Sequence, residues 1–410
     1  MNQIADNRQQ SKVDYSLHDC FMSAFAMMHF QDPSILEFQR RMEEEKHQNN
    51  LKTIFGANAI PSDTQLREVL DNSPYDKLNA VFSDYFRVLQ RAKQLEQFQF
   101  LPKTHLVTLD GSEYFSSEKI KCPQCLVKTS KKGNSRYHHQ ILQAAIVCPG
   151  IKQIIPLASE PIQNTDGKDK QDCEINAGKR ILKRIRKMHP KLKIIIVADS
   201  LYSKQPFIEL LKKLGFSFIL TAKPGDHKVM MELINKHQKL GAVSHSEHKD
   251  FKDKQHIYKW INDVPLNGNR ETVLVNYFDY SQVAKEKVTY HNSWVTDITV
   301  DKHNKAKLVK GGRARWKIEN EGFNTLKNQG YHLDHNFGHG KKNLSFNFFL
   351  LNMLAFFVHQ ILELTDLLYK KCRAKFSARK EYWNQLRCTI RIMIFSSWEE
   401  LLKFIVLPAG

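Results

Sequence analysis

The stretch Leu192-Lys-Ile-Ile-Ile-Val-Ala-Asp-Ser-Leu-Tyr202 decides the class of fold. Its run of β-branched residues predicts a short apolar strand, which ends at Asp199. We expect a basic helix before this strand, over residues 172–188, and a helix and a strand after it, over 205–214 and 216–222. Strands that alternate with helices in this way indicate a sheet with helices packed on it.

A second strand of this kind lies upstream, where His105-Leu-Val-Thr-Leu109 leads into Asp110. Strands are also predicted over Tyr137–Val147 and Lys152–Leu157, with Pro149-Gly150 as the turn of a hairpin between them. The resulting order, β-β-β-α-β-α-β, predicts an α/β fold in which a mixed sheet is flanked by helices.

Changes of pattern divide the chain into five parts. Residues 1–100 show helical spacing and predict a helical N-terminal region, and 101–222 hold the first part of the sheet core. Short strands and turns over 223–311 predict a β-rich insertion. Residues 312–362 would carry the last helices of the core, and 363–410 a helical C-terminal region.

The chain of 410 residues is strongly basic, with 62 Lys and Arg against 43 Asp and Glu and a net charge of +19. Residues 1–100 carry 11 basic and 14 acidic side chains, so the excess lies in the remainder. Such an excess favours a polyanionic partner, because neutralised phosphates release counterions. Basic clusters over 179–187 and 370–380 fit contacts with a DNA backbone, and they also fit a solvated surface.

The cysteines and the apolar segments bear on the compartment. Seven cysteines are scattered and the N-terminus is polar, so we expect a reducing cytoplasm. The segment Leu344–Val358 is very apolar, but Asn347 and Asn352 interrupt it. The uninterrupted run is too short to span a membrane, so we expect a buried helix and no membrane partner.

Two carboxylates, Asp110 and Asp199, each follow an apolar strand, and strand ends hold side chains rigidly at the edge of a sheet. If the two strands are neighbours, both carboxylates can bind one divalent cation. Mg²⁺ prefers carboxylate oxygens and keeps positions open for phosphate. The alternative is that each Asp is only a cap.

A third carboxylate, Glu319, lies in the stretch Arg313–Lys327, for which we expect a helix. On such a helix Glu319 shares a face with three apolar residues, Trp316, Phe323 and Leu326. An ionised Glu on that face is costly unless it is paired or binds a metal. A buried ion pair with Arg315, one turn earlier, is the alternative.

The sequence Cys122-Pro-Gln-Cys125 is followed by His138 and His139, with twelve residues between Cys125 and His138. This spacing resembles half of a zinc site, and we expect Cys122, Cys125 and His138 to be the ligands of a structural Zn²⁺. His139 and Cys148 are further candidates. Neighbouring strand residues point to opposite faces, so the two histidines cannot easily share a site. A reduced turn without metal is the alternative.

Three motifs, taken together and in this order, resemble the DDE transposases of bacterial insertion sequences. They are Leu109-Asp110-Gly, Ala198-Asp199-Ser-Leu-Tyr202, and Arg315-Trp-Lys-Ile-Glu319 with Leu326-Lys327 downstream. The resemblance is to the cut-and-paste branch, which has a β-rich insertion, an Asp-x-x-Tyr element and a Tyr-x2-Arg-x3-Glu-x6-Lys signature. It covers roughly residues 60–360 and implies an RNase H-like fold.

The resemblance also implies the roles of the site residues. Asp110, Asp199 and Glu319 would form the catalytic triad and bind two Mg²⁺ ions. DNA phosphate would be contacted by three further residues, Tyr202, Arg315 and Lys327.

The chain departs from the family signature at two positions. Gly312 stands where the signature has Tyr, and Lys327 comes eight residues after Glu319, where the signature has seven. The second departure puts the phosphate-binding role of Lys327 in doubt and leaves Glu321 as an alternative third ligand.

The activity that the resemblance implies is metal-dependent cleavage of double-stranded DNA at element ends, followed by strand transfer into target DNA, carried out by a homodimer on the DNA. Trp260 in the insertion is a candidate for stacking on a flipped base, and a core or exposed-strand Trp is its alternative. Two other functions remain open. A non-catalytic, zinc-containing DNA-binding regulator would not need Asp199 or Glu319, and an RNase H-like nuclease would cut without joining.

Overall fold

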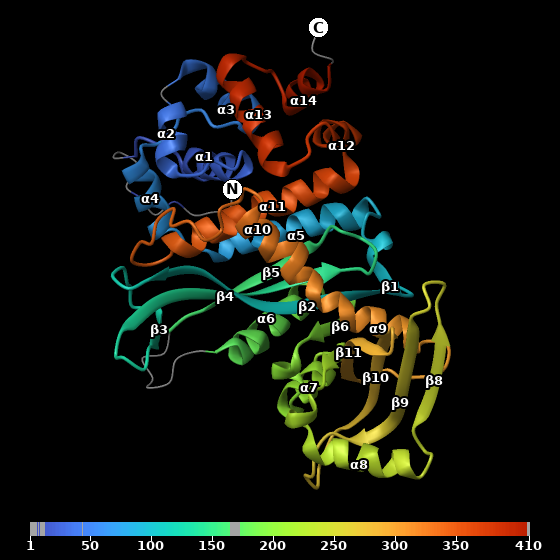
Figure 1. The fold of residues 1–410 in the computed structure, drawn as a ribbon. Helices are drawn as coiled ribbons and strands as arrows, with labels where there is room; N and C mark the ends of the chain where they lie inside the picture. The colour runs from blue at the N-terminus through green and yellow to red at the C-terminus, as the bar shows by residue number, and fades with distance from the viewer. Residues whose placement is uncertain (1–5, 7, 9–12, 43, 165–172, 408–410) are drawn as a thin grey trace.

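The structure is a computed structural model that describes residues 6, 8, 13–42, 44–164 and 173–407 (Figure 1). The described residues form one 11-stranded mixed sheet with helices around it. The strand order is β3-β4-β2-β6-β7-β11-β10-β9-β8, with β1 paired to β2 and β5 paired to β4. The predicted class, a mixed α/β sheet flanked by helices, is confirmed.

The core strands reproduce the predicted β-β-β-α-β-α-β order, with two short strands added. The elements of this part are β1 (Gln99–Leu101), β2 (Thr104–Ser117), β3 (Leu126–Thr129), β4 (Ser135–Val147), β5 (Ile155–Ile162), α6 (Glu174–Met188), β6 (Lys193–Ala198), α7 (Gln205–Lys213) and β7 (Ser217–Thr221). The helix predicted from residue 172 begins at Glu174, with the extended residue Cys173 as its N-cap; residue 172 lies outside the described part.

One prediction about the first strand is wrong. β2 does not end at Asp110 but continues to Ser117, because β4 pairs with it from Leu106↔Val147 to Ser117↔Tyr137. Asp110 therefore lies within a strand, at the point where the parallel partner β6 ends and only the antiparallel partner β4 continues.

The insertion extends the same sheet. Its elements are α8 (Lys228–Lys239), β8 (Ser244–Lys249), β9 (Gln255–Pro265), β10 (Leu274–Ala284) and β11 (Lys287–Thr296). β11 pairs antiparallel with β7, which joins the insertion to the core through backbone hydrogen bonds. Residues 223–311 are thus rich in strands, as the sequence predicts, and the five-part division of the chain stays a prediction.

Helices from the two ends of the chain meet above the sheet (Figure 1). They are α1 (Leu17–His29), α2 (Ile35–Met42), α3 (Glu45–Phe55), α4 (Asp63–Asn72) and α5 (Asp76–Arg91) from the N-terminal region, and α11 (Leu344–Thr365), α12 (Leu367–Ala374), α13 (Arg379–Ile392) and α14 (Trp398–Val406) from the C-terminal part. α1 packs on α11 and α3 packs on α13.

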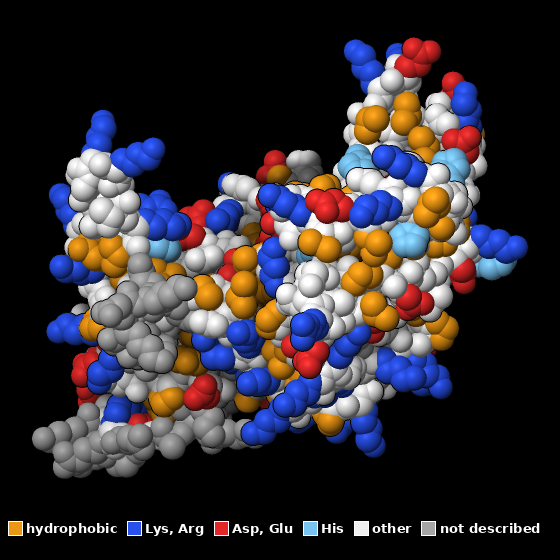
Figure 2. All heavy atoms as spheres, turned by 90° about the horizontal axis from the view of Figure 1, so that it is seen from below, with side chains coloured by type: hydrophobic (Ala, Val, Ile, Leu, Met, Phe, Trp, Pro, Cys, Tyr) orange, Lys and Arg blue, Asp and Glu red, His pale blue; other side chains and the backbone are white. Residues whose placement is uncertain are grey.

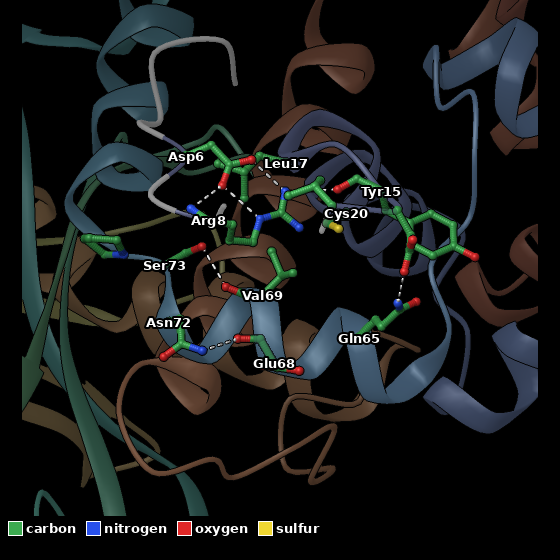
Figure 3. Close-up of a pocket in the computed structure, with 13 residues that line it drawn as sticks. Asp6, Arg8, Tyr15, Leu17, Cys20, Gln65, Glu68, Val69, Asn72 and Ser73 are labelled. Carbon is green, nitrogen blue, oxygen red and sulfur yellow. Dashed lines mark hydrogen bonds and ion pairs between the residues drawn. The ribbon is translucent and has the colours of Figure 1, made fainter. Parts of the chain in front are cut away.

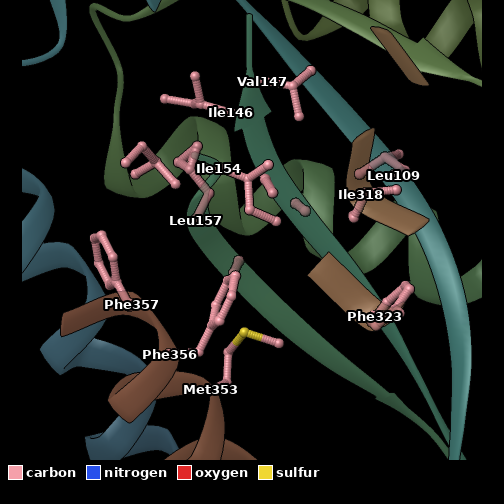
Figure 4. Close-up of a cluster of buried hydrophobic side chains, with 14 of the residues drawn as sticks. Leu109, Ile146, Val147, Ile154, Leu157, Ile318, Phe323, Met353, Phe356 and Phe357 are labelled. Carbon is pink, nitrogen blue, oxygen red and sulfur yellow. The ribbon is translucent and has the colours of Figure 1, made fainter. Parts of the chain in front are cut away.

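The sheet is covered on both faces. α5 and α11 pack on β5, and α6 contacts β4 and β5 from the other side (Figure 1). Figure 4 shows apolar side chains of β2, β4, β5 and α11 converging in one core, with Leu109, Leu157 and Phe356 among them. α11 is long and apolar enough to cross a membrane by length and composition, but 67% of its most apolar window is buried inside the protein. The expectation of a buried helix is confirmed.

Candidate active site and cysteine-histidine cluster

Two of the predicted carboxylates lie side by side at the middle of the sheet. β2 and β6 are parallel neighbours with Thr104 opposite Lys193 and Thr108 opposite Val197. The same register places Asp110 beside Asp199, and neighbouring strands are about 4.8 Å apart. Asp199 is also a cap, since its Oδ1 accepts a hydrogen bond of 2.9 Å from the backbone of Leu201. Capping and proximity to Asp110 are therefore both present.

An irregular helical segment brings Glu319 close to Asp110. The helical segment runs through α9 (Lys305–Arg313), a 3₁₀ turn η5 (Ala314–Trp316), a π-helical segment η6 (Ile318–Phe323) and α10 (Asn324–Asn328). Both η5 and η6 pack on β2. π-helical segments inside helices are frequent at functional sites, because the wider turn re-aims a side chain.

The predicted apolar face around Glu319 is only partly correct. Phe323 and Leu326 are buried, but Trp316 is 46% exposed. The prediction assumed a regular α-helix, whereas the tightened 3₁₀ turn and the widened π turn change the direction of each side chain. Glu319 itself is partly buried.

Arg315 faces Asp110. Its Nη1 lies 4.0 Å from Asp110 Oδ1, and its backbone oxygen is 3.5 Å from the hydroxyl of Thr108 on β2. The predicted alternative, in which Arg315 pairs with Glu319, is thus replaced by an ion pair across to the strand.

When no cation is present, the surroundings of Asp110 favour its protonated form. The pKa of Asp110 is raised to about 7: burial raises it, Arg315 lowers it, and three carboxylates, Glu174, Glu319 and Asp199, add to the rise. The three predicted carboxylates therefore share one electrostatic environment. A carboxyl group whose pKa is raised by burial and by like charges marks a candidate functional site.

The fourth carboxylate, Glu174, was not predicted as a site residue. It begins α6, and its Oε1 accepts a hydrogen bond of 2.8 Å from the hydroxyl of Tyr202. A Cβ on Gly111 would lie 2.6 Å from Glu174 Oε2, so the absence of a side chain at Gly111 makes room for this carboxylate beside Asp110. Burial raises the pKa of Glu174, and Asp199 adds to the effect.

The remaining predicted DNA contacts are placed as follows. Tyr202 is 1% exposed and its hydroxyl is directed at Glu174. Lys327 Nζ lies 3.5 Å from Asp334 Oδ1, and the Lys327 side chain is partly exposed. Glu321 is partly buried and close in sequence to Glu319. Which carboxylate binds metal, and which residues contact DNA, stay predictions.

Trp260 does not suit the stacking role considered for it. It lies on β9 opposite Phe278 and is 8% exposed, so the alternative of a core Trp is the one that the structure has. Trp316 is the exposed aromatic residue next to the carboxylates, with the guanidinium of Arg315 4.3 Å from its ring centre.

A second cluster of side chains lies beside the N-terminal half of β4, around His139. Four side chains, Cys122, Cys125, His139 and His339, each offer one ligand atom, and these atoms all lie within 4.8 Å of one another. The prediction of His138 as a ligand is wrong. Residues alternate between faces along a strand, and it is His139 that points to the cysteines. His339, from the loop before α11, was missed because 200 residues separate it from His139.

The basic clusters have mixed roles. On α6, Arg180 and Arg184 both pair with Glu160, at 2.6 and 2.9 Å, and Arg186 donates to the backbone oxygen of Leu214 at 2.7 Å. These arginines hold the fold together, while Lys183 and Lys187 are exposed. Figure 2 shows one face of the molecule with Lys and Arg side chains spread widely over it.

Two hollows lie away from the carboxylates. A pocket of about 370 Å³ between the N-terminal segment and α4 contains the Asp6–Arg8 ion pair of 2.7 Å and none of the predicted site residues (Figure 3). An open hollow of about 680 Å³ lies at the end of α10. In its lining, Arg379 pairs with Glu363 at 2.7 Å. Four further lining residues are basic: Lys152, Lys370, Arg373 and Lys380.

The comparison with protein families agrees with the geometry. A family model described as transposase DDE domain matches residues 127–357, which is more than half of the chain. The matched residues include Asp199 and Glu319 and begin after Asp110. No curated protein matches the chain. The mixed sheet flanked by helices is consistent with this match, and the chain belongs to the family of transposase DDE domains.

Proposed function

We propose that the protein cuts double-stranded DNA at the ends of a mobile element and joins the ends to target DNA, with Asp110, Asp199 and Glu319 as the Mg²⁺-binding triad. The observation that carries this proposal is the convergence of these carboxylates on one parallel strand pair, in a chain of the transposase family. A homodimer that holds two DNA ends is part of the proposal.

The donor set fits hard divalent cations. Carboxylate oxygens are the ligands that Mg²⁺ prefers. Burial, and to a smaller extent the neighbouring carboxylates, raises the pKa of Asp110, and a bound cation would offset both effects. Asp110, Asp199 and Glu319 would hold Mg²⁺, which would supply activation of the attacking water or DNA 3′-hydroxyl and stabilisation of the leaving oxygen in an in-line displacement.

The chain's own groups would then position the DNA. Arg315 offers a guanidinium beside Asp110, and this group is suited to bind a phosphate from two directions. Trp316 presents an exposed ring on which a base can stack, and Lys327 and the basic hollow beyond α10 would follow the backbone. Glu174 and Tyr202 would act as positioning residues, because their hydrogen bond fixes the wall of the site next to Gly111.

The test uses oligonucleotides that carry the DNA found at the two edges of the element, together with a supercoiled plasmid as target. With Mg²⁺, the proposal expects strand breaks at the element ends and covalent insertion of the ends into the plasmid. Breaks without any joined product, even when pre-cut ends with free 3′-hydroxyls are supplied, would favour the nuclease that cuts without joining. Binding without breaks would favour the regulator.

A further inference from the structure

We propose that Cys122, Cys125, His139 and His339 bind one Zn²⁺ ion, which ties the loop after the catalytic helix to the sheet. This structural site is separate from the carboxylates and does not depend on the function proposed above. Its four ligands come from three places in the chain: the segment between β2 and β3, strand β4, and the loop between α10 and α11.

The distances between the ligand atoms match those of a tetrahedral zinc centre. With Zn–S of about 2.3 Å and Zn–N of about 2.0–2.1 Å, a regular tetrahedron separates two sulfurs by about 3.8 Å, a sulfur and a nitrogen by about 3.6 Å, and two nitrogens by about 3.3 Å. In the protein, Cys122 Sγ and Cys125 Sγ are 3.7 Å apart, and His139 Nε2 is 3.6 and 3.5 Å from them. His339 Nε2 lies 3.4 Å from Cys125 Sγ and 3.1 Å from His139 Nε2.

These spacings do not suit the other arrangements that two cysteines commonly form. A disulfide needs its sulfurs at about 2.05 Å, far closer than 3.7 Å. A hydrogen-bonded group of neutral side chains has no reason to bring two imidazole Nε2 atoms and two sulfurs around a single point. A shared cation does require that arrangement, and thiolate and imidazole are the ligands that Zn²⁺ takes in structural sites.

The surroundings are those of a metal site. His339 Nδ1 is 3.0 Å from the backbone oxygen of Gly340, so this nitrogen can donate its proton there and leave Nε2 free as a ligand. The backbone N–H of Cys122 points to Cys125 Sγ at 3.4 Å. The ring of Phe115 lies against both histidines, with centroid distances of 4.5 Å to His339 and 5.6 Å to His139. An apolar wall of this kind limits access of water to the ligands.

The proposed zinc would fix a segment that follows the catalytic helix. Four consecutive backbone N–H groups, from Lys341 to Leu344, already donate to the carboxylate of Asp71 at 2.9–3.0 Å. His339 would add a second attachment on the other side of the same loop, to β4, the strand that pairs with the Asp110 segment. The loop between Glu319 and α11 is then held by two elements distant in the sequence.

The test measures metal on the full chain without DNA. Protein from zinc-supplied cultures, purified without chelator, is expected to contain about one zinc per chain by mass spectrometry of metals, not displaced by excess Mg²⁺. Metal-free protein titrated with Co²⁺ is expected to show the visible absorption of tetrahedral cobalt with thiolate ligands. The readout involves neither cleavage nor the carboxylates, so its failure leaves the proposed function standing.

Three variants of two histidines in the loop between α10 and α11 test which residues bind the metal. His339→Ala should weaken zinc affinity by about 100-fold or more, because loss of a direct ligand costs at least as much as loss of an outer partner. His339→Cys should restore zinc binding and shift the cobalt spectrum to that of three thiolates. His335→Ala, an exposed histidine of the same loop, should retain wild-type zinc. Wild-type protein without zinc or a cobalt spectrum, or a His339→Ala variant with wild-type affinity, would overturn the proposal.

Discussion

At the scale of single residues, the carboxylate site is a place of concentrated negative charge next to a strand. Asp110, Glu174 and Asp199 lie close enough for their charges to influence one another, and Gly111 leaves the room that Glu174 occupies. Such crowding costs stability in the protein without metal and is relieved when a cation binds.

This crowding predicts the pH dependence of stability. The pKa of Asp110 is about 7 in the folded chain and about 4 when unfolded, so the folded state holds the extra proton between these values. Stability of the Mg²⁺-free protein therefore falls as pH rises through that window. Asp110→Asn removes the effect, and its advantage over wild type in urea unfolding should grow by roughly 2–3 kcal/mol between about pH 5 and pH 8.

The comparison of the two proteins at each pH cancels other titrating groups, including those of the cysteine-histidine cluster. Saturating Mg²⁺ at pH 8 should stabilise the wild type and close part of the gap to Asp110→Asn. A gap that stays constant from pH 5 to pH 8 would contradict the shared acidic environment.

The sequence predicted some of these residues and not others, for a physical reason. Asp110 and Asp199 were found because each stands at the end of an apolar run, which a local pattern reveals. Glu174 and His339 carry no such pattern, since an acidic residue at a helix start and a histidine in a loop are common. Their roles depend on contacts between segments far apart in the chain, with Tyr202 and Cys125 respectively.

At the scale of elements, the helix that carries Glu319 is shaped by close packing at Gly312. A Cβ on Gly312 would lie 2.5 Å from Nε1 and 2.6 Å from Cε2 of Trp294, whose rigid indole is fully buried. Trp294 of β11 fills the space beside Gly312.

Gly312→Ala is therefore expected to destabilise the protein, although Ala favours helix formation by about 1 kcal/mol over Gly. The clash with the indole costs up to about 3 kcal/mol, because overpacking a dense core forces the surroundings to shift. The expected net loss is about 1–2 kcal/mol in chemical unfolding.

A matched control is Gly225→Ala, where an added Cβ meets nothing within 4 Å and φ is not positive. It should change the unfolding free energy by less than about 0.5 kcal/mol. Equal unfolding free energies of the two variants would show that the Trp294 indole can shift at little cost and that the packing at Gly312 does not constrain the helix.

The elements themselves were largely predictable, but their irregularities were not. Apolar runs located β2, β4, β6 and β7, and helical spacing located the segment around Glu319. The extension of β2 to Ser117 depends on pairing with β4, and the π segment depends on packing against β2. Neither partner is visible in a local window of sequence.

At the scale of the whole molecule, the two ends of the chain form one helical layer. Asn50 of α3 is fully buried and lies between the ends of α13 and α14. Its side-chain amide donates to the backbone oxygens of Ile390 and Met393, both at 2.6 Å, and its oxygen accepts from the backbone of Phe395 at 2.8 Å.

Asn50→Ala should weaken the attachment of the C-terminal helices α13 and α14 to α3. It leaves two buried backbone groups, of Ile390 and Phe395, and one part-buried backbone group, of Met393, without their partner, and each buried group costs about 1 kcal/mol or more. We expect a loss of about 2–4 kcal/mol in unfolding free energy and faster proteolysis within residues 363–410. Asn58→Ala, at an exposed position eight residues further along, serves as control and should leave both unchanged. Equal behaviour of the two variants would contradict a joint helical layer.

The sequence could not predict these long-range arrangements. Its pattern suggested separate N-terminal and C-terminal helical regions and a distinct insertion. The packing of α3 on α13, and the pairing of β11 with β7, join segments that are up to hundreds of residues apart. Hydrophobic spacing shows that a face is buried, but not which other segment covers it.

Asp110, Asp199 and Glu319 are proposed to form the metal site that cuts DNA. The most direct measurement is Mg²⁺-dependent nicking of DNA with the element ends by Asp199→Asn, Glu319→Gln and Glu321→Gln beside wild type. We predict that the first two lose at least about 1000-fold in rate while remaining folded and DNA-bound, and that Glu321→Gln keeps most activity. Nicking that persists in Asp199→Asn and Glu319→Gln, or that needs no divalent metal, would contradict the account.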